Sequence, residues 1–316
     1  MTQRENKTIV DFSKFVPKTF DSPEGIPSGK CELNDWQSAN RDFWESNPMR
    51  YDWKKKNSYD EGSIEFFHEI DRVFFNEIKA IMPWRKIPFD NLISFGTLKN
   101  KSILEIGVGM GSHAALIAPY SKSYTGIDLT EYAFKMTSKR MELSQLHPNY
   151  KIIRMNAEKL DFSDNSFDLV WSWGVIHHSA KTENILNEIH RVLKPGGSAK
   201  IMVYHRGWWN YYFVGFLIHG IILGGFLKHD NLAKVVQDNT DGAIARYYST
   251  NSWRHLAGKI LSVKSISISG NRADLFPIPA GVIKDFIINI SPNKGLRFLL
   301  SNLRMGSFLI SELRKE

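Results

Sequence analysis

Three glycines and one aspartate are the residues of this chain whose types and spacing most directly indicate chemistry. Gly107, Gly109 and Gly111 follow the apolar segment 102–106, and Asp128 ends the next apolar segment. Glycine lets the backbone approach a ligand closely and adopt positive φ. A helix that begins after such a turn directs free N–H groups at an anionic group, and an acid at the end of the second strand can accept the hydroxyls of a ribose. These residues predict a site for an adenosine-bearing cofactor.

The glycine spacing narrows the choice of cofactor. The dinucleotide fingerprint is G-x-G-x-x-G, but here the sixth position is Ser112, and no G-x-x-x-x-G-K-[ST] loop is present. With Glu105 in front, the run resembles the first motif, E/D-x-G-x-G-x-G, of the class I S-adenosylmethionine (SAM) methyltransferases, and Asp128 matches their acidic second motif. The resemblance implies SAM as the cofactor, with these binding residues in the two motifs: Glu105, Gly107, Gly109, Gly111, Asp128 and Leu129.

Further segments resemble the same family, in the same order, over residues of about 100 to 206. Asn156-Ala157-Glu158 matches an (Asp/Asn)-Ala-Glu segment that lies beside the adenine, and residues 162–178 resemble the entry and exit of the fourth strand. Leu193-Lys194-Pro195-Gly196-Gly197 matches the turn before the fifth strand. The resemblance, which is to the small-molecule, type 11-like branch, adds Asn156, Ala157, Glu158, Trp173 and Gly174 to the implied cofactor-binding residues.

Histidines follow the predicted fourth and fifth strands. Ligands in open α/β sheets bind outside the carboxyl ends of the strands, and Ile176-His177-His178 resembles a sequence common there in this branch. A histidine can act as a general base near neutral pH, and we expect His178 in that role, with His177 and His205 as further candidates. The alternative is that one histidine packs against the cofactor and another caps a helix. We expect no metal site, because no carboxylate or cysteine completes a ligand pattern.

The elements that must position these residues alternate between strand and helix. Strands are predicted at 102–106, 123–127, 151–155, 167–171 and 198–204, and helices at 112–118, 130–145 and 181–193. This order predicts an α/β fold with a parallel sheet. Further strands at 259–270 and 306–311 resemble the end of the family's Rossmann-like seven-stranded sheet, whose final strand is antiparallel. Segment 62–81 has the apolar spacing of an amphipathic helix, whereas residues 1–60, rich in proline and aromatic residues, favour an irregular N-terminal cap.

Twenty residues without a formal charge, 208–227, lie between the predicted fifth and sixth strands. Their length would span a bilayer, but a single crossing would place the last strands on the wrong side of the membrane from the rest of the sheet. We interpret the segment first as an apolar lid over the substrate pocket, with a buried helical hairpin as an equal alternative. A membrane-surface contact is the next interpretation and a true span the last. The expected organisation is a cap at 1–100, a SAM-binding core at 101–206, an insertion at 207–258 and final strands at 259–316.

Charge and cysteine content limit the protein class. The chain has 316 residues, a net charge of +8 and one cysteine, so an internal disulfide framework is excluded. Residues 201–316 carry 14 Lys and Arg against 7 Asp and Glu, which suits an anionic partner or a solvated basic face. The polar N-terminus has no apolar stretch of a secretory signal, and we expect a cytoplasmic protein, with membrane-peripheral contact through 208–227 as the alternative. Nucleic acid is not the expected partner, and the sequence does not indicate the oligomeric state.

The sequence therefore predicts a SAM-dependent methyltransferase that acts on a small, fairly apolar metabolite by direct displacement. Tyr51, Tyr204 and Asp241 are the candidate substrate-binding residues. Tyr51 belongs to a lead-in found in some small-molecule members of the family, and Asp241 to an element that follows the insertion. An RNA or tRNA methyltransferase is the alternative enzyme, although the Asn/Asp-Pro-Pro-Tyr signature is replaced by Ser172-Trp173-Gly174-Val175. A SAM-binding scaffold without activity is the alternative that is not an enzyme.

Overall fold

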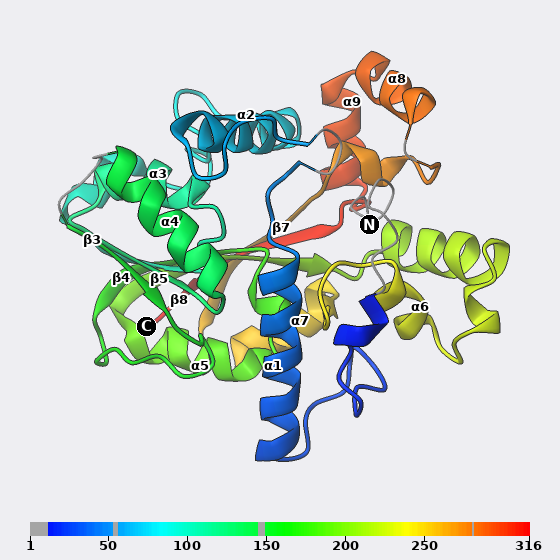
Figure 1. The fold of residues 1–316 in the computed structure, drawn as a ribbon, viewed down its shortest axis with the longest axis horizontal. Coiled ribbons are helices and arrows are strands. Elements are labelled where there is room, and N and C mark those ends of the chain that lie inside the picture. The colour runs from blue at the N-terminus through cyan, green and yellow to red at the C-terminus, as the bar shows by residue number, and fades with distance from the viewer. Residues whose placement is uncertain (1–11, 53–55, 145–148, 280) are drawn as a thin grey trace.

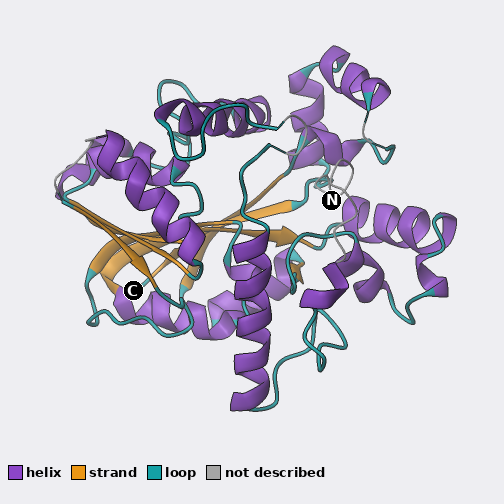
Figure 2. Cartoon of the chain, in the orientation of Figure 1, coloured by secondary structure: helices purple, strands orange, loops and turns teal. Residues whose placement is uncertain are grey.

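A mixed sheet forms the centre of the computed structural model, which describes residues 12–52, 56–144, 149–279 and 281–316. The strand order is β3-β2-β1-β4-β5-β8-β7, with β6 paired to β5 (Figures 1 and 2). Strands β1 to β6 pair in parallel, and β8 runs antiparallel to both β5 and β7. The strands are β1 (Ser102–Ile106), β2 (Ser123–Asp128), β3 (Tyr150–Arg154), β4 (Phe167–Trp173), β5 (Leu193–His205), β6 (Tyr247–Tyr248), β7 (Ser262–Ser269) and β8 (Phe308–Arg314).

The α/β Rossmann-like fold and its antiparallel final strand are confirmed. The predicted count of seven strands omits β6, which has two residues and pairs with Tyr204 and His205 at the end of β5. A strand this short has no periodic pattern of its own, because its position is set by its partner in the sheet. The seven remaining strands form the main path of the sheet.

Helices cover both faces of the sheet (Figure 1). Alternate residues of β1 enter separate cores, since Ile103 packs with residues of α2, α3 and α4 and Leu104 packs with residues of α5 and α7. This alternation follows from the two-residue period of a strand. The helices are α1 (Lys30–Ser46), α2 (Ile64–Ile81), α3 (Ser112–Ile117), α4 (Glu131–Ser144), α5 (Thr182–Val192), α6 (Leu232–Asp238), α7 (Thr250–Gly258), α8 (Val282–Ile290) and α9 (Asn293–Arg297).

The N-terminal segment is more regular than predicted. Residues 1–60 were expected to be irregular, but α1 occupies Lys30–Ser46 and buries Trp36 and Phe43. Its end is attached to the core, since the Glu45 carboxylate accepts hydrogen bonds from the backbone N–H groups of Glu131 and Tyr132 at 2.8 and 3.1 Å. A carboxylate at the start of a helix is stabilised by the helix dipole. The contact holds α1 over the carboxyl end of β2, where α4 begins.

The uncharged insertion folds mainly as one helix, Trp208–Ile222, in which Leu223 N–H bonds to Ile218 O across five residues. One side of the helix is attached to the fold: Asn210 is 4% exposed, and its Nδ2 donates to Met305 O at 2.8 Å. The other side remains at the surface, so the segment is not a fully buried hairpin. No helix among the described residues is both long and apolar enough to cross a membrane.

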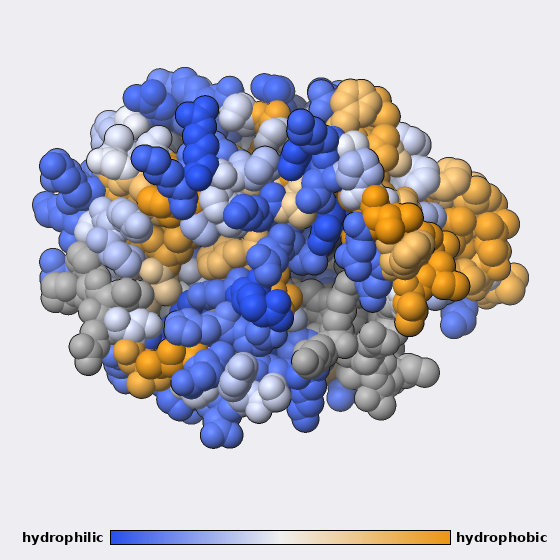
Figure 3. All heavy atoms as spheres, turned by 90° about the horizontal axis from the view of Figure 1, so that it is seen from above, coloured by the Kyte–Doolittle hydropathy of each residue, from blue (hydrophilic) through white to orange (hydrophobic). Residues whose placement is uncertain are grey.

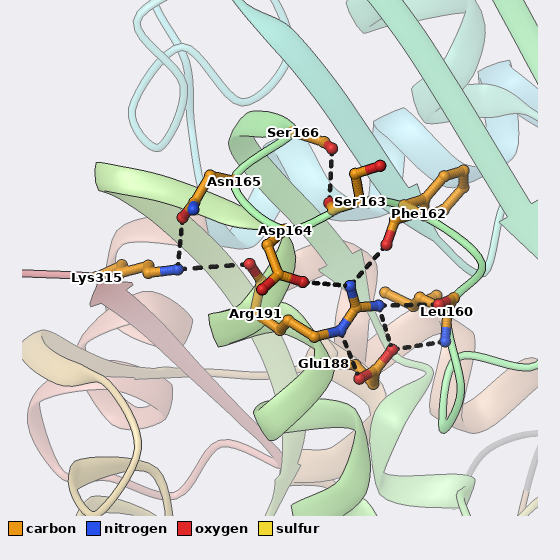
Figure 4. Close-up of polar contacts among 9 residues, drawn as sticks. All are labelled: Leu160, Phe162, Ser163, Asp164, Asn165, Ser166, Glu188, Arg191 and Lys315. Atoms are coloured by element: carbon orange, nitrogen blue, oxygen red, sulfur yellow. Dashed lines mark hydrogen bonds and ion pairs between the residues drawn. The ribbon is translucent and has the colours of Figure 1, made fainter.

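Arg191 at the end of α5 holds the loop that precedes β4 (Figure 4). Its guanidinium forms an ion pair with Glu188 at 2.8 Å and one with Asp164 at 2.8 Å, and it also donates to the carbonyl oxygens of Leu160 and Phe162. The hydrogen bonds from Arg191 lower the pKa of Glu188. The position of β4 therefore depends on the contacts that Arg191 makes with the loop before the first residue of this strand.

We expect Arg191→Met to lower the free energy of unfolding by about 1–3 kcal/mol, the range for charge-assisted hydrogen bonds reduced by partial exposure. Urea denaturation measures this change, with Arg254→Met, an exposed arginine on α7, as the matched control. The contribution of Glu188 is complete above the ordinary glutamate pKa of about 4.3 and is lost as the pH falls through its lowered folded value. The difference between wild type and Arg191→Met should therefore shrink below about pH 4. Equal losses in both variants would contradict this role.

Candidate active site

A cavity of about 540 Å³ lies at the carboxyl ends of β1, β2, β4 and β5. The turn after β1 forms one part of its wall, and α1 and α2 contribute the covering residues Trp44 and Phe74. Asn210 of the insertion helix and Asp274 also line it. The cavity thus lies between the core and residues of the N-terminal segment, the insertion and the last part of the chain.

The three glycines of the turn after β1 have different structural roles. Gly107 has a φ of 84°, and a Cβ at this position would overlap the Val175 side chain. Gly111 has a φ of 74° and lies directly before α3. Gly109 has a φ of 52°, but a Cβ there would meet no atom within 4 Å, and the residue lines the cavity. Gly107 is therefore required by packing, whereas the space beside Gly109 is available to a ligand.

Asp128 at the end of β2 is held in position by backbone groups. One carboxylate oxygen accepts from Gly109 N–H at 3.1 Å, and the other accepts from the Thr130 N–H at 3.0 Å and the Thr130 hydroxyl at 2.8 Å. Enclosure in the cavity raises the pKa of Asp128, and these hydrogen bonds oppose the shift. The aspartate thereby fixes the glycine turn and still lines the cavity.

The segment after β3 reaches the same cavity. Leu129, Asn156, Ala157 and Glu158 all line it. The Glu158 carboxylate is already engaged with the start of α5, since it accepts from Lys181 N–H at 2.9 Å and from Asn184 Nδ2 at 3.3 Å. Trp173 and Gly174 line the cavity from the end of β4. The structure therefore brings these predicted cofactor-binding residues to the same cavity as Gly107, Gly109 and Asp128.

Glu105 and Gly111, in contrast, do not belong to the lining of the cavity. Glu105 is 1% exposed, and its carboxylate accepts from the Tyr124 hydroxyl and lies 3.5 Å from His113 Nδ1. This carboxylate links β1 to β2 and to α3 through these contacts, and its predicted contact with the cofactor stays a prediction.

Aromatic and acidic side chains also line the cavity. The predicted substrate residues Tyr51, Tyr204 and Asp241 are among them. Tyr204 stacks on Tyr247 with ring centroids 5.3 Å apart. Burial raises the pKa of Tyr51, Tyr204 and Tyr247, and the nearby Asp241 adds to the shift for the last two, so their hydroxyls stay protonated and can donate hydrogen bonds.

Sequence reasoning did not find several residues of the cavity wall. Trp44, Asn210, Tyr247 and Asp274 line the cavity, and Asp274 is 7% exposed with Oδ1 lacking a hydrogen-bond partner among the described residues. They lie on four segments that are distant in the sequence. Trp44 belongs to the same lead-in as Tyr51, and Tyr247 follows the element that contains Asp241, so the sequence carried a signal for these two but none for Asn210 and Asp274.

His178 is the histidine that combines cavity exposure with a defined tautomer. It lines the cavity, and its Nδ1 lies 2.7 Å from Ile244 O. A carbonyl oxygen only accepts, so Nδ1 carries the hydrogen and Nε2 keeps its lone pair. Burial lowers the pKa of His178 to about 4. The ring is therefore neutral near pH 7 and has a free acceptor nitrogen.

His177 and His205, predicted as further catalytic candidates, do not line the cavity. His177 is 0% exposed and packs between His178 and Tyr204, with ring centroids 4.1 and 3.9 Å away. Burial lowers the pKa of both His177 and His205. His205 Nδ1 bonds to Gly306 O at 2.8 Å. The geometry assigns these two rings to packing around the site.

The family model described as a methyltransferase domain (Methyltransf_11) matches residues 104–201. These residues include the glycine turn, Asp128 and the β4 exit, which the structure brings to one cavity. Residues 104–201 are a SAM-dependent methyltransferase domain. The domain is of the class I, type 11 branch, and SAM is its cofactor.

Curated methyltransferases are similar to about a third of this chain. A sterol 24-C-methyltransferase from Neurospora crassa is 32% identical over 104 residues, which cover 33% of this chain and 27% of that protein. A phthiotriol/phenolphthiotriol dimycocerosates methyltransferase from Mycobacterium tuberculosis is 36% identical over 102 residues, covering 32% of this chain and 36% of that protein. The chain thus matches about a third of the length of these relatives.

The similarity of folds extends beyond the methyltransferase domain. The crystal structure of geranyl diphosphate C-methyltransferase from Streptomyces coelicolor A3(2) superposes with a TM-score of 0.54 at 11% identity. The match covers 92% of this chain and 100% of that one. The N-terminal helices and the segments after β5 therefore belong to an arrangement that a solved methyltransferase shares.

The residues that line the cavity fit SAM, as their contacts and their unpaired polar atoms indicate. The backbone at Gly109 is open to the cavity, and Asp128 lines it beside that glycine. Ser112 Oγ, Asn40 Oδ1 and Ser179 Oγ are buried at the cavity wall without a hydrogen-bond partner among the described residues. Buried polar atoms are normally paired, so these three atoms suit the polar groups of a bound ligand.

Proposed function

We propose that this chain transfers a methyl group from SAM to a small molecule that has an apolar body and at least one polar group. The observation that carries the proposal is that one cavity is lined by the cofactor residues Gly109 and Asp128 and also by Trp173, Tyr204 and Phe308. Aromatic walls with a few placed polar groups are typical of small-molecule sites. A polynucleotide would instead need an extended cationic surface.

When bound, SAM supplies an electrophilic methyl group on a sulfonium. The residues that would hold it are the backbone at Gly107 and Gly109, the Asp128 carboxylate at the ribose hydroxyls, and the segment around Asn156. Enclosure by Trp44 and Phe74 excludes water, and positioning of two reactants contributes about 7–11 kcal/mol to such a reaction. His178 Nε2 would take the proton that the acceptor loses.

The relatives are compatible with an acceptor of this kind. Two of them carry sterol and phthiotriol acceptors in their names, and another is a phosphoethanolamine N-methyltransferase from Caenorhabditis elegans. These acceptors differ in polarity and in the atom that is methylated. They support a small-molecule acceptor without indicating which atom of it receives the methyl group.

An RNA acceptor is the second candidate because residues 201–316 are basic. Many of those cations are occupied in the fold. Arg246 is 7% exposed and donates to backbone carbonyl oxygens, including Ala180 O at 2.6 Å. Lys264 and Arg272 form ion pairs with Glu316 and Glu77. Because these cations are already engaged within the fold, the basic composition of residues 201–316 supports an RNA acceptor less than the count of charges alone indicates. A small-molecule acceptor is favoured.

The test is transfer of radiolabelled methyl groups from SAM into a cell extract, followed by separation into organic, aqueous small-molecule and nucleic-acid fractions. We expect label in the organic or small-molecule fraction, entering at least about a hundredfold more slowly with His178→Asn. SAM binding is measured in parallel by calorimetry, so that an absent acceptor is distinguished from an absent cofactor site. Label that precipitates with RNA and disappears after ribonuclease treatment would overturn the proposal.

A further inference from the structure

Exposed apolar side chains gather at one end of the molecule (Figure 3). They come from two segments, the insertion 208–227 and α8, whose most exposed members include Leu227 at 93%, Val282 at 87% and Ile283 at 74%. Phe216, Ile222 and Phe286 add exposed rings and branched chains. We call the exposed side chains of 208–227 and α8 the apolar end. Exposed apolar side chains gathered in this way indicate an interaction site.

The start of the insertion helix is attached to the segments that precede and follow α8 and α9 in the sequence. Trp209 Nε1 donates to Asp274 O at 3.0 Å, and Trp208 Nε1 donates to Leu303 O at 2.9 Å. Asn210 and Asp274, which line the cavity, lie next to these contacts. The insertion helix, which carries part of the apolar end, therefore starts at the wall of the cavity and is held there by hydrogen bonds.

The charges around the apolar end are mostly positive. Residues 206–228 contain Arg206 and Lys228 and no acid, and residues 281–305 contain four Lys and Arg against one Asp. Of these cations, Lys228, Lys294 and Arg304 are exposed. Exposed apolar side chains beside basic residues match the interface of an anionic bilayer, which offers both hydrocarbon and negative headgroups.

We propose that the apolar end docks this chain on the surface of an anionic lipid bilayer. A second copy of the chain is the less suitable occupant, because a two-fold interface would place the same cations opposite one another. The exposed aromatic residues Trp208 and Tyr212 are of the types that concentrate at membrane interfaces. If the proposed function holds, an apolar acceptor would pass from the bilayer to the adjoining cavity without crossing water.

The test is co-sedimentation of the full chain with vesicles of phosphatidylcholine alone and of phosphatidylcholine with phosphatidylglycerol. We expect binding to the anionic vesicles, weakened about tenfold or more by Leu227→Glu or Val282→Glu. Each variant removes apolar area that would enter the bilayer and adds a negative charge that the anionic headgroups repel. Leu143→Glu, which makes the same change at an exposed position of α4, is the matched control. It should bind like wild type.

Thermal midpoints and SAM affinity of all variants are measured in the same preparations. Unchanged SAM affinity in Leu227→Glu separates loss of docking from loss of the proposed function. Absence of binding to anionic vesicles, or equal weakening by Leu143→Glu, would refute the proposal. So would a wild-type dimer in gel filtration that Val282→Glu dissociates, because the apolar end would then be the interface between two copies.

Discussion

Gly107→Ala is expected to abolish SAM binding and to destabilise the fold strongly, whereas Gly109→Ala should abolish SAM binding with a smaller loss of stability. At Gly107 a Cβ would overlap Val175, and φ is 84°. Overpacking of this kind costs about 1–3 kcal/mol, and a left-handed backbone about 1–2 kcal/mol more. At Gly109 the Cβ would enter the open space of the cavity, so only the backbone strain of about 1–2 kcal/mol acts on the fold.

Chemical denaturation and calorimetric titration with SAM measure the two effects separately. Val175→Ala combined with Gly107→Ala is the matched control for the clash, because it removes the methyl groups that the new Cβ would meet. It should recover part of the stability and leave the backbone strain. If Gly109→Ala bound SAM with wild-type affinity, the open space beside this glycine would not be the place of the cofactor.

The positions of the core strands and of the glycine turn could be predicted because their signals are local. β1 was predicted at 102–106 and is observed at Ser102–Ile106, and the predicted strand 123–127 extends only to Asp128. An apolar run that ends at glycines specifies both the strand and the turn without reference to the rest of the chain. The convergence of Asp128 and Gly174 on one cavity then follows from the parallel sheet.

The surroundings of the acceptor could not be predicted because they depend on long-range packing. Tyr247 meets Tyr204 through the two-residue pairing of β6 with β5, and Asp274 reaches the cavity from the short 3-10 helix Arg272–Leu275 before α8. The buried positions of α1, Trp36, Asn40 and Phe43, do have helical spacing, but Asn40 is polar, so the apolar pattern that would have indicated the helix is interrupted. Similarly, a His-His pair does not reveal that one ring is enclosed and the other lines the cavity.

His178→Asn is expected to lower kcat by about 10²- to 10⁴-fold, the usual contribution of a general base, and to leave the dissociation constant for SAM unchanged. The asparagine is close in size but has no basic nitrogen to replace Nε2. His255→Asn, an exposed histidine on α7, is the control for the loss of a histidine. A fall in kcat with an equal loss of SAM affinity would instead indicate that His178 positions the cofactor.

The pH dependence distinguishes a base from a packing residue. Because burial lowers the pKa of His178 to about 4, the ring is neutral over the physiological range, and kcat/KM should decrease only as the pH falls toward that value. An unperturbed histidine would produce the decrease near pH 6.5. The folded state favours the neutral ring, so acid also destabilises the protein, and circular dichroism at each pH identifies the range in which it remains folded. Within that range, a profile for His178→Asn parallel to the wild-type profile would show that the decrease arises from another group and would remove His178 from the proton transfer.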